Sequence, residues 1–473
     1  MEDKTMKKVF GIAALLLALV ACNKIETQNQ PAGGAEGIPF SATVSLGDSP
    51  ATKALAENGS TLTATWDAGE KVALIHNSVI DEMTVSSVSG GSATITGTIT
   101  GTPTDGDAVT IIYPSSAADG ATGDIKTDLL YAQNGLLTGE GSISECFEAR
   151  KGTGTLKVDG TATLSGGVSL ANQFAIFKFT VKNYDGSAAI SASPLTITIG
   201  TQDYVITPVT ATDVLYAALT AASGEKVSFD ATDADGKTYT CAKLSVSFEA
   251  GKYYQSTLKM REYVDLGIVV DGKKIKWATC NVGASKPEDY GDYYAWGEVE
   301  PYYSSQDPLT WKEGKTGYNW ASYKWCNGAY NKLTKYCPTD KTSYWDGEGS
   351  PDGKTVLEPE DDAAHVSLGS KWRMPTDEEW TELRTECTWT RTTQNGVNGR
   401  LVTGKNGNSI FLPAAGSWNG TNLNGAGNHG YYWSSSLTTD DTYCGWTVYF
   451  YSDIVYRDYY DRFRGFSVRP VTE

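Results

Sequence analysis

The first part of the chain is divided into short runs of β-forming residues, and this division is what most limits its fold. Between residues 39 and 260, runs rich in Val, Ile, Thr and Phe recur at intervals of roughly 8 to 15 residues, separated by Gly, Asp, Asn and Pro. No long amphipathic helix pattern interrupts them. The pattern predicts antiparallel β-sandwiches. The runs are TLTATW, KVALIH, ATITGTIT, AVTIIYP, FAIFKFTV, LTITIG and KLSVSF.

Tryptophan marks a second part of the chain with a different composition. Twelve of the 13 tryptophans and 19 of the 27 tyrosines lie after residue 262. We therefore expect a domain boundary near Met260. The Gly-rich segment at residues 157–167 predicts a further division inside the first part. Two or three domains agree with a length of 473 residues.

The N-terminus is predicted to be a targeting signal. Lys7 and Lys8 precede an apolar run at residues 9–21, which is too short to span a bilayer as a helix. The run ends in LVAC, which resembles a bacterial lipobox with Cys22 as the lipid acceptor. We expect a lipoprotein signal peptide at 1–22, a flexible tether at 23–38 and a lipid anchor in a membrane. A plain signal peptide with a chance cysteine is the alternative.

Charge and cysteine content limit the partners and cofactors. A net charge of −17 argues against a nucleic-acid partner, because phosphate binding needs a basic surface. Seven cysteines follow Cys22, but there is no CxxC pair and the histidines are scattered, so we expect no zinc site and no cofactor. Cys326 with Cys337, or Cys280 with Cys387, could form disulfides; buried free thiols are the alternative.

Residues 39–260 resemble the fimbrillin family of Bacteroidales pilus proteins. The stretches at 51–74 (ATKALAENGSTLTATWDAGEKVAL), 174–181 (FAIFKFTV) and 248–260 (FEAGKYYQSTLKM) carry the resemblance. It implies two transthyretin-like β-sandwiches, at 39–165 and 166–260, in an outer-membrane surface lipoprotein that joins other pilus subunits by β-strand addition. It also suggests Lys53 as a processing site; an exposed loop lysine is the alternative.

One helix is predicted in the second part of the chain, within KWRMPTDEEWTELR at 371–384. Thr376 followed three residues later by Glu379 is a capping-box pattern. Trp380 and Leu383 then repeat at helical spacing. We interpret this helix as structural.

The C-terminal segments are predicted to be strands, at 431–436, 445–453 and 465–471. In the second of these, alternation puts Trp446, Val448 and Phe450 on a core face. Thr447, Tyr449 and Tyr451 fall on the other face, which is too aromatic to be merely solvated.

Residues 263–473 resemble the Fibrobacter succinogenes major paralogous domain. The words VDLG, WATCNVGA, GDYYAWGE, WRMPT, GNSIFLPAAG, GYYWSSS and GFSVRPV carry the match. The resemblance implies a mixed α+β, C-type-lectin-like ligand-binding domain. The same fold carries the hypervariable residues of diversity-generating retroelement proteins near its C-terminus. The fold class expected for the whole chain is therefore mainly β, with two sandwiches followed by this domain.

Between the segments LPAAG and SVRPV, which are typical of a core, lie aromatic and polar residues of a kind that can vary without disturbing the fold. Tyr supplies stiff contact area, while Arg, Asp and Asn add charge and hydrogen bonds, which suits recognition of a glycan or a protein. We therefore expect a surface adhesin. The candidate ligand-binding residues are Trp418, Asn419, Asn422, Asn424, His429, Thr442, Tyr443, Thr447, Tyr449, Tyr451, Asp453, Arg457, Asp458, Tyr460, Arg462 and Arg464.

Catalysis, calcium binding and a purely structural role are the alternatives to a ligand-binding adhesin. An enzyme related to the formylglycine-generating enzymes is disfavoured, because only Cys444 lies near the C-terminus and no GxSxG, HExxH or P-loop pattern occurs. Calcium could bind the acidic segment at 358–365, but the EPN, QPD and WND words of calcium-dependent lectins are missing. A structural pilus subunit with no ligand of its own is the third possibility.

Overall fold

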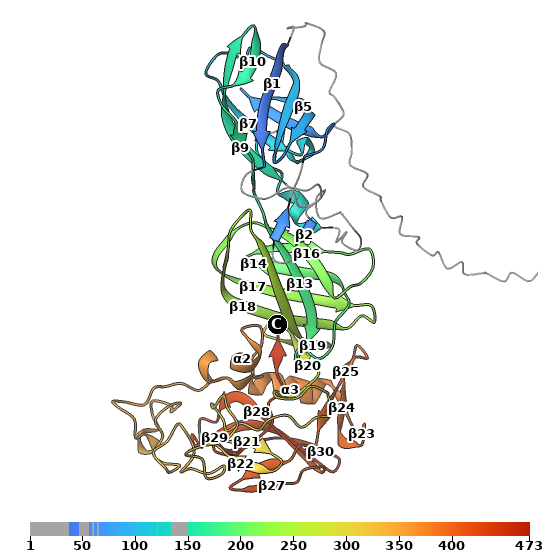
Figure 1. Cartoon of the computed structure of the whole chain (residues 1–473). Coiled ribbons are helices and arrows are strands. Elements are labelled where there is room, and N and C mark those ends of the chain that lie inside the picture. The colour runs from blue at the N-terminus through green and yellow to red at the C-terminus, as the bar shows by residue number, and fades with distance from the viewer. Residues whose placement is uncertain (1–36, 47–55, 59–60, 64–65, 121, 134–148) are drawn as a thin grey trace, which may run out of the picture.

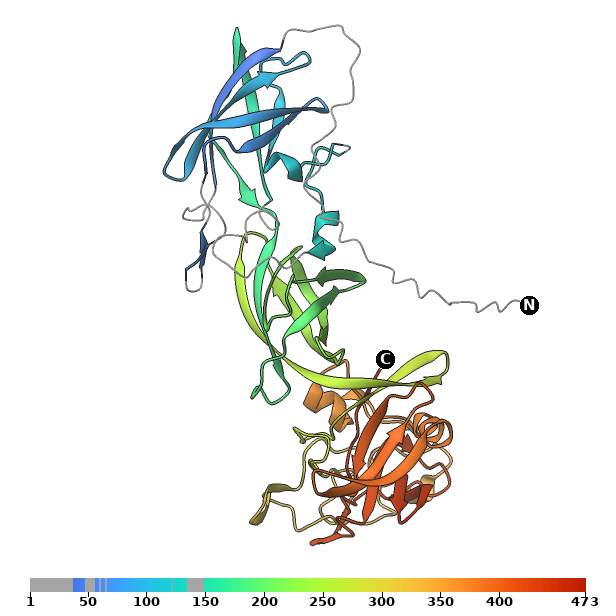
Figure 2. The same cartoon turned by 90° about the vertical axis from the view of Figure 1, so that its right-hand side faces the viewer.

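The computed structural model describes residues 37–46, 56–58, 61–63, 66–120, 122–133 and 149–473. These residues form an elongated molecule in which two β-sheet bodies and a C-terminal unit follow one another (Figures 1 and 2). Strands dominate the described residues, so the mainly-β prediction is confirmed. Cys22, Lys53 and Cys146 lie outside the described residues. Within those residues, no helix is both long and apolar enough to cross a membrane.

The first body is a nine-stranded sheet in the order β10-β1-β6-β5-β4-β7-β9-β12, with β11 beside β1. Strand β10 pairs with both β1 and β9, so the sheet closes on itself. A separate hairpin joins β2 and β3. The strands are β1 (Ile38–Ser45), β2 (Ala56–Asn58), β3 (Thr61–Thr63), β4 (Lys71–His76), β5 (Val79–Ser89), β6 (Ser92–Ile99), β7 (Ala108–Tyr113), β9 (Arg150–Asp159), β10 (Thr161–Leu164), β11 (Val168–Ser169) and β12 (Ala171–Asn172).

The second body has the strand order β16-β13-β19-β18-β17-β14-β15-β8. Its buried residues and those of the first body form one continuous apolar cluster. The strands are β8 (Ala132–Gln133), β13 (Ala175–Asn183), β14 (Ala192–Ile199), β15 (Gln202–Ile206), β16 (Val214–Leu219), β17 (Ala222–Asp233), β18 (Thr238–Phe248) and β19 (Tyr253–Val270). Short 3-10 helices lie at Ser115–Ala117 and Asp128–Leu130.

The division between these two bodies differs from the predicted one. The Gly-rich segment at 157–167 forms the hairpin of β9 and β10, with Gly160 at a positive φ of 68° in the turn. The first sheet continues to Asn172, while β8 has already joined the second sheet. The side-chain amide of Gln133 holds β8 in the second body, because it donates to the Ala218 carbonyl oxygen at 2.6 Å and accepts from the Ala218 N–H at 2.9 Å.

The C-terminal unit contains short strands, long irregular segments and two α-helices among its described residues. The capping box predicted at the start of α3 is confirmed, with Thr376 and Glu379 bonding reciprocally. The elements are β20 (Lys273–Ala278), β21 (Tyr303–Gln306), β22 (Leu309–Trp311), α2 (Ala363–Leu368), α3 (Asp377–Glu386), β23 (Thr388–Gln394), β24 (Val397–Thr403), β25 (Ser409–Pro413), β26 (Ser417–Asn419), β27 (Asn422–Asn424), β28 (His429–Leu437), β29 (Cys444–Tyr451), β30 (Ile454–Asp461) and β31 (Val471–Thr472), with 3-10 helices at Thr342–Tyr344 and Pro359–Asp361.

Strand β19 runs through the boundary that composition placed near Met260. Its first half pairs with β13, residues Arg261 to Tyr263 pair with β18, and its second half pairs with β20. The C-terminal strand β31 then pairs with β20. The second body and the C-terminal unit therefore share one ten-stranded sheet.

Side chains reinforce this junction on both sides of β19. Lys371 forms an ion pair with Asp230 at 3.2 Å, and the Tyr184 hydroxyl donates to the Ser367 carbonyl oxygen at 3.2 Å. Asn406 and Asn408 each donate a side-chain N–H to the Asp265 carbonyl oxygen at 2.9 Å. The contacts join parts of the chain that are more than a hundred residues apart.

The six described cysteines after Cys146 are all free thiols. Five are buried, and Cys387 is half-buried. Neither of the two predicted disulfides is present, and the alternative of free thiols is confirmed for these residues. Cys280 lines the junction near Arg261, whereas Cys387 follows the end of α3.

Denaturation of unreduced protein in iodoacetamide is expected to alkylate all six of these cysteines. Among these six, only Cys387 should react in the native chain, and slowly, because burial raises the pKa of its thiol to about 11. Peptide mass spectrometry after digestion measures both. A disulfide-linked pair of peptides containing Cys326 and Cys337 would contradict the structure.

Trypsin is expected to leave the bond after Arg261 intact in the native chain. Arg261 is 3% exposed and lies inside a paired strand, which a protease must open before it can cut. Lys237, exposed in the turn between β17 and β18, is the internal control for cleavage. N-terminal sequencing of early fragments tests this, and a stable fragment that begins at Glu262 would show that the shared strand is not rigid.

Candidate functional site

Three antiparallel strands near the end of the chain, β28, β29 and β30, form the sheet that carries the candidate site (Figure 1). Tyr431 pairs with Tyr449, and Tyr449 pairs with Tyr456. Because side chains alternate between the faces of a strand, these three tyrosines share one face of the sheet. The residues next to them in sequence point to the other face.

The inner face of this sheet is core. Tyr432, Val448 and Phe450 are almost fully buried and belong to the cluster that contains Trp380 of α3. The Tyr432 hydroxyl donates to the Pro413 carbonyl oxygen at 2.7 Å, so its polar end is satisfied. The core face predicted for Val448 and Phe450 is confirmed, whereas Trp446 is only half-buried.

Six ring side chains of the outer face reach solvent at least in part, and we call them the tyrosine face; Trp433 of the same face is buried. Tyr451 and Tyr456 are each 37% exposed, and the other four are half-buried. Rings with this much exposure are not ordinary core. The tyrosine face consists of His429 and Tyr431 on β28, Tyr449 and Tyr451 on β29, and Tyr456 and Tyr460 on β30.

The rings of the tyrosine face stack on one another across the strands. The ring centroids of Tyr431 and Tyr449 are 4.5 Å apart with an interplanar angle of 19°, and those of Tyr449 and Tyr456 are 5.9 Å apart at 16°. The His429 ring stacks on Tyr451 at 5.4 Å. Cross-strand aromatic pairs of this kind stabilise a sheet and fix its side-chain rotamers.

The hydroxyls of Tyr431, Tyr449 and Tyr460 remain protonated at neutral pH. Burial, followed by the neighbouring Tyr431, raises the pKa of Tyr449, and burial also raises the pKa of Tyr431. Burial raises the pKa of Tyr460 as well, and its hydroxyl donates to the Asp458 carboxylate, which raises it further. A protonated hydroxyl can donate a hydrogen bond: that of Tyr460 does so to Asp458, and those of Tyr431 and Tyr449 lie 3.4 and 3.5 Å from the Nδ1 of His429.

Several predicted site residues lie on or beside the tyrosine face. His429, Tyr449, Tyr451 and Tyr460 belong to it, and Asp458 shares the same side of β30. Exposed polar side chains lie beside the tyrosine face. They are Asn419, Asn422 and Asn424 on the hairpin of β26 and β27, which adjoins His429 through Gly425, and Asp453 in the turn after β29.

Arg462 was predicted to bind ligand, but its side chain is completely buried. Its guanidinium donates to the Lys335 carbonyl oxygen at 3.0 Å and also to the carbonyl oxygens of Tyr336 and Thr442. It lies 5.0 Å from the Trp296 ring. Arg462 thus holds two irregular segments together and cannot belong to an exposed binding surface.

Three other predicted residues are also inside the unit. Trp418 packs among Tyr293, Tyr318 and Trp311 in an aromatic cluster. Thr442 and Thr447 are no more than 1% exposed, and Thr447 is buried where it pairs with Trp433. Burial corrects the prediction for all of them, because an interior side chain cannot touch a ligand on the surface.

The remaining predicted residues lie elsewhere on the surface. Arg457 lies on the opposite face of β30, where it forms a bidentate ion pair with Asp377 at 2.6 and 2.7 Å and covers the Trp446 ring at 3.4 Å. Tyr443 packs 5.3 Å from Tyr330, away from the tyrosine face. Arg464 lies at the edge of the face, 5.6 Å from the Tyr460 ring.

Sequence reasoning missed Tyr431 and Tyr456. Both occupy positions that the period of two predicts for the outward face, since Tyr431 follows His429 by two residues and Tyr456 precedes Asp458 by two. Extending the alternation of β29 to its two neighbouring strands would have found them.

The acidic segment at 358–365 is engaged in structure. Asp361 accepts from the Tyr336 hydroxyl at 2.7 Å and from Lys335 at 2.5 Å. Asp362 caps α2 by accepting from the backbone N–H groups of Ala364 and His365. Across the described ranges, no group of three or more His, Cys, Asp or Glu side chains could hold a metal ion.

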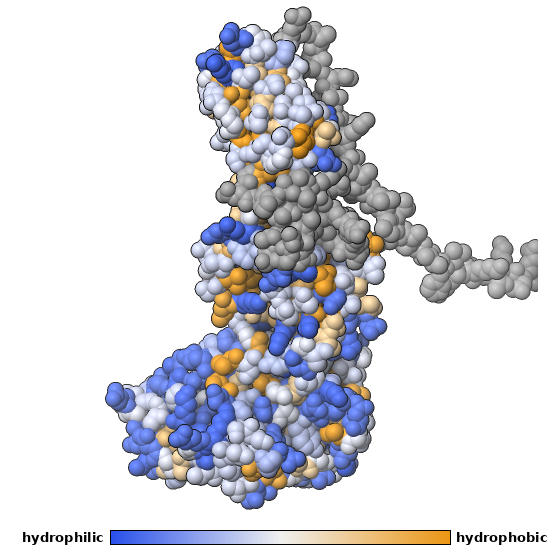
Figure 3. All heavy atoms as spheres, in the orientation of Figure 1, coloured by the Kyte–Doolittle hydropathy of each residue, from blue (hydrophilic) through white to orange (hydrophobic). Residues whose placement is uncertain are grey.

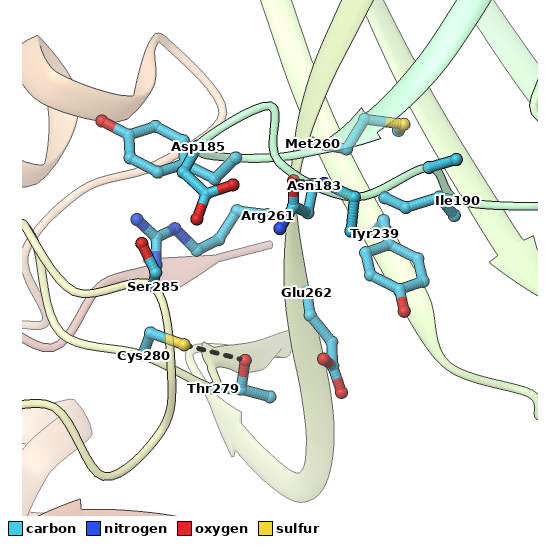
Figure 4. Close-up of a pocket in the computed structure, with 13 residues that line it drawn as sticks. Asn183, Asp185, Ile190, Tyr239, Met260, Arg261, Glu262, Thr279, Cys280 and Ser285 are labelled. Carbon is cyan, nitrogen blue, oxygen red and sulfur yellow. Dashed lines mark hydrogen bonds between the residues drawn. The ribbon is translucent and has the colours of Figure 1, made fainter.

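A cavity of about 190 Å³ at the junction is another place where polar side chains converge. Arg261 extends from β19 toward Asp185 and Ser285 (Figure 4). Its Nη1 donates to the Ala284 carbonyl oxygen at 3.0 Å, and its guanidinium lies 4.1 Å from the Tyr184 ring. The cavity is lined by two carboxylates and one guanidinium, and its residues come from both sides of the junction. We therefore interpret it as part of the joint between the second body and the C-terminal unit.

The C-terminal unit is predominantly polar on the side that Figure 3 presents. Figure 3 shows a mostly hydrophilic surface on the visible side of the C-terminal unit, whereas orange areas are more prominent on the first body. A polar surface that carries exposed tyrosines is typical of a reversible contact rather than of a permanent apolar interface.

Comparison with known proteins gives one family match. The family described as "Domain of unknown function (DUF8237)" matches residues 381–471, a range that includes β28, β29 and β30. The match spans less than half of the chain. A search of curated proteins finds no match.

Several solved structures are distantly similar. A fimbrial protein from Bacteroides ovatus shares 14% identity over 93% of this chain and 99% of its own, with a TM-score of 0.21. A protein proposed to act in cell adhesion in Bacteroides uniformis shares 12% identity over 48% of this chain and 95% of its own, with a TM-score of 0.27. The pilus 2b backbone protein of group B streptococcus shares 12% identity over 49% of this chain and 88% of its own, with a TM-score of 0.17. TM-scores this low do not establish a shared fold.

Arg462→Met is expected to lower the free energy of unfolding of the C-terminal unit by about 3 kcal/mol, because three carbonyl oxygens lose their donor inside the protein. Arg457→Met is the matched control, with a loss of about 1 kcal/mol or less, since its ion pair is exposed. Urea unfolding followed by tryptophan fluorescence measures both, because 12 of the 13 tryptophans lie in this unit. Equal losses would contradict the structural role of Arg462.

Proposed function

We propose that this chain is a cell-surface adhesin whose C-terminal unit binds a glycan or a protein through the tyrosine face. The observation that carries the proposal is the set of ring side chains on the outer face of the last three strands, with Tyr451 and Tyr456 each 37% exposed. A chain that needed these residues only for its core would bury them on the inner face. Stiff, amphipathic tyrosines are what recognition surfaces favour.

The arrangement of the bodies suits display. The C-terminal unit lies at the opposite end of the molecule from the first body (Figure 2). In the proposal, Cys22 anchors the chain to the outer membrane through lipid, or the chain is processed at Lys53 and carried in fimbriae. The unit that carries the tyrosine face then lies at the other end of the molecule from the first body (Figure 2).

Assembly with other pilus subunits by β-strand addition is part of the proposal. Strand addition needs an open sheet edge. The first sheet closes through β10, so a strand of this sheet would have to leave before a strand from another subunit could enter. The alternative is a structural fimbrial subunit in which the tyrosine face has no ligand.

Binding of the full chain to a printed glycan array and to a printed array of purified extracellular proteins tests the proposal. The parent is expected to bind one of them, and Tyr451→Ala/Tyr456→Ala is expected to lose that binding at least tenfold, because exposed aromatic residues are typical hot spots. The matched control is Tyr459→Ala, since Tyr459 is 44% exposed on the opposite face of the same strand.

Thermal unfolding of each variant shows whether it is folded. Equal binding by the parent and a folded double variant would move the site away from the tyrosine face. If the parent binds nothing on either array, the structural-subunit function is favoured, and immunogold labelling along fibre shafts is the measurement that follows.

A further inference from the structure

The tyrosine face presents ring edges and hydroxyls rather than ring faces. Tyr449 lies between Tyr431 at 4.5 Å and Tyr456 at 5.9 Å, with both interplanar angles below 20°. Its ring is therefore covered on both sides by other rings. A ligand that approaches the sheet from solvent cannot stack on it.

The neighbouring rings are covered in the same way. Tyr431 stacks on Tyr449 on one side and on Phe466 at 4.9 Å on the other. Tyr451 lies between His429 at 5.4 Å and Tyr456 at 6.1 Å. Tyr460 packs edge-on against Tyr431 and Phe466 and is half-buried.

Tyr456 differs from the other tyrosines, because it lies on the edge strand of the sheet. Its described ring contacts are with Tyr449 and Tyr451, both on β29. One side of its ring therefore has no ring partner among the described residues. The tyrosine face thus offers a single platform on which a flat apolar surface could stack.

The two classes of ligand left open above make different demands on such a surface. A sugar is held by stacking its C–H face on an exposed ring face, supported by hydrogen bonds. A protein surface can be held by a row of hydroxyl donors that meets carbonyl or carboxylate oxygens. Rings that are already stacked lose little side-chain entropy when a ligand binds to their hydroxyls.

Resting on the proposed function, we propose that the ligand is a protein surface rich in hydrogen-bond acceptors, which the hydroxyls of the tyrosine face contact directly. The stacked rings act as rigid supports that hold the hydroxyls in place. Arg464, which forms an ion pair with Asp461 at 3.7 Å, adds further N–H donors at the edge of the same surface, and these suit an acceptor-rich partner.

Replacement of tyrosine by phenylalanine separates the hydroxyl from the ring. The experiment measures the full chain against two probes, an array of enzymatically deglycosylated extracellular proteins and a printed glycan array. The parent is expected to bind a deglycosylated protein. Tyr451→Phe/Tyr456→Phe should weaken that binding about tenfold or more, because the probe loses its hydrogen bonds to this pair of hydroxyls, which also bond each other. The same change in the control variant Tyr459→Phe should leave binding within twofold.

The outcomes distinguish this inference from the function on which it rests. Binding that survives the phenylalanine variant but is lost in Tyr451→Ala/Tyr456→Ala overturns the hydroxyl contact and leaves the tyrosine face as the site. Binding to glycans alone, dependent on the Tyr456 ring, also overturns the inference and keeps the site. Binding that neither variant changes, or no binding to either probe, overturns the proposed function itself.

Discussion

The main-chain hydrogen bonds of β19 are the constraint on which the rest of the molecule depends. A single strand of 18 residues pairs in turn with β13, β18 and β20. Leu258 and Met260 are buried in the core of the sandwiches, whereas Leu266 and Ile268 are buried in the C-terminal unit. A flexible linker would leave the second body and the C-terminal unit free to turn, but a shared strand fixes their relative orientation, and the position of the tyrosine face with it.

The C-terminal unit has long irregular segments, so side chains satisfy many of its backbone groups. The Trp296 indole N–H donates to the Ser434 carbonyl oxygen at 2.8 Å, and the Tyr323 hydroxyl donates to the carbonyl oxygen of Trp296 at 2.8 Å. The Trp433 indole N–H bonds Tyr294 in the same manner. Tryptophan and tyrosine can fill a core and still supply a donor, which explains why both residue types are concentrated after residue 262.

Local sequence patterns predicted much of the fold. Six of the seven runs in the first part form strands, as KVALIH and β4 show, and Thr376 caps α3 as its spacing to Glu379 predicts. The strand predicted at 465–471 is wrong, because Gly465, Phe466 and Ser467 make only isolated bridges before β31. The alternation of Val448 and Phe450 with Tyr449 and Tyr451 located the outer face correctly. These features depend on neighbours within a few residues, so a single sequence contains them.

Features that depend on contacts between distant parts of the chain could not be predicted from local patterns. Composition changes near residue 262, but β19 continues because its partners β13 and β20 lie on both sides of that change. Trp418 is buried by Tyr293 and Tyr318, which are more than 90 residues away in sequence. Arg462 belongs to a residue type that is mostly exposed, and nothing next to it in sequence signals that backbone oxygens would enclose it.

The buried arginines leave the segments around them free to change in sequence. Arg469 donates to the main-chain carbonyl oxygens of Ala278, Thr279 and Phe411 as well as to the Asn281 side chain, and Arg462 donates to three main-chain carbonyl oxygens. Every amino acid supplies a main-chain carbonyl oxygen, so the main-chain attachments do not depend on which side chain stands at the accepting position. Mutation can therefore alter the outward residues of the attached loops while their anchoring points persist, which makes this unit an evolvable scaffold.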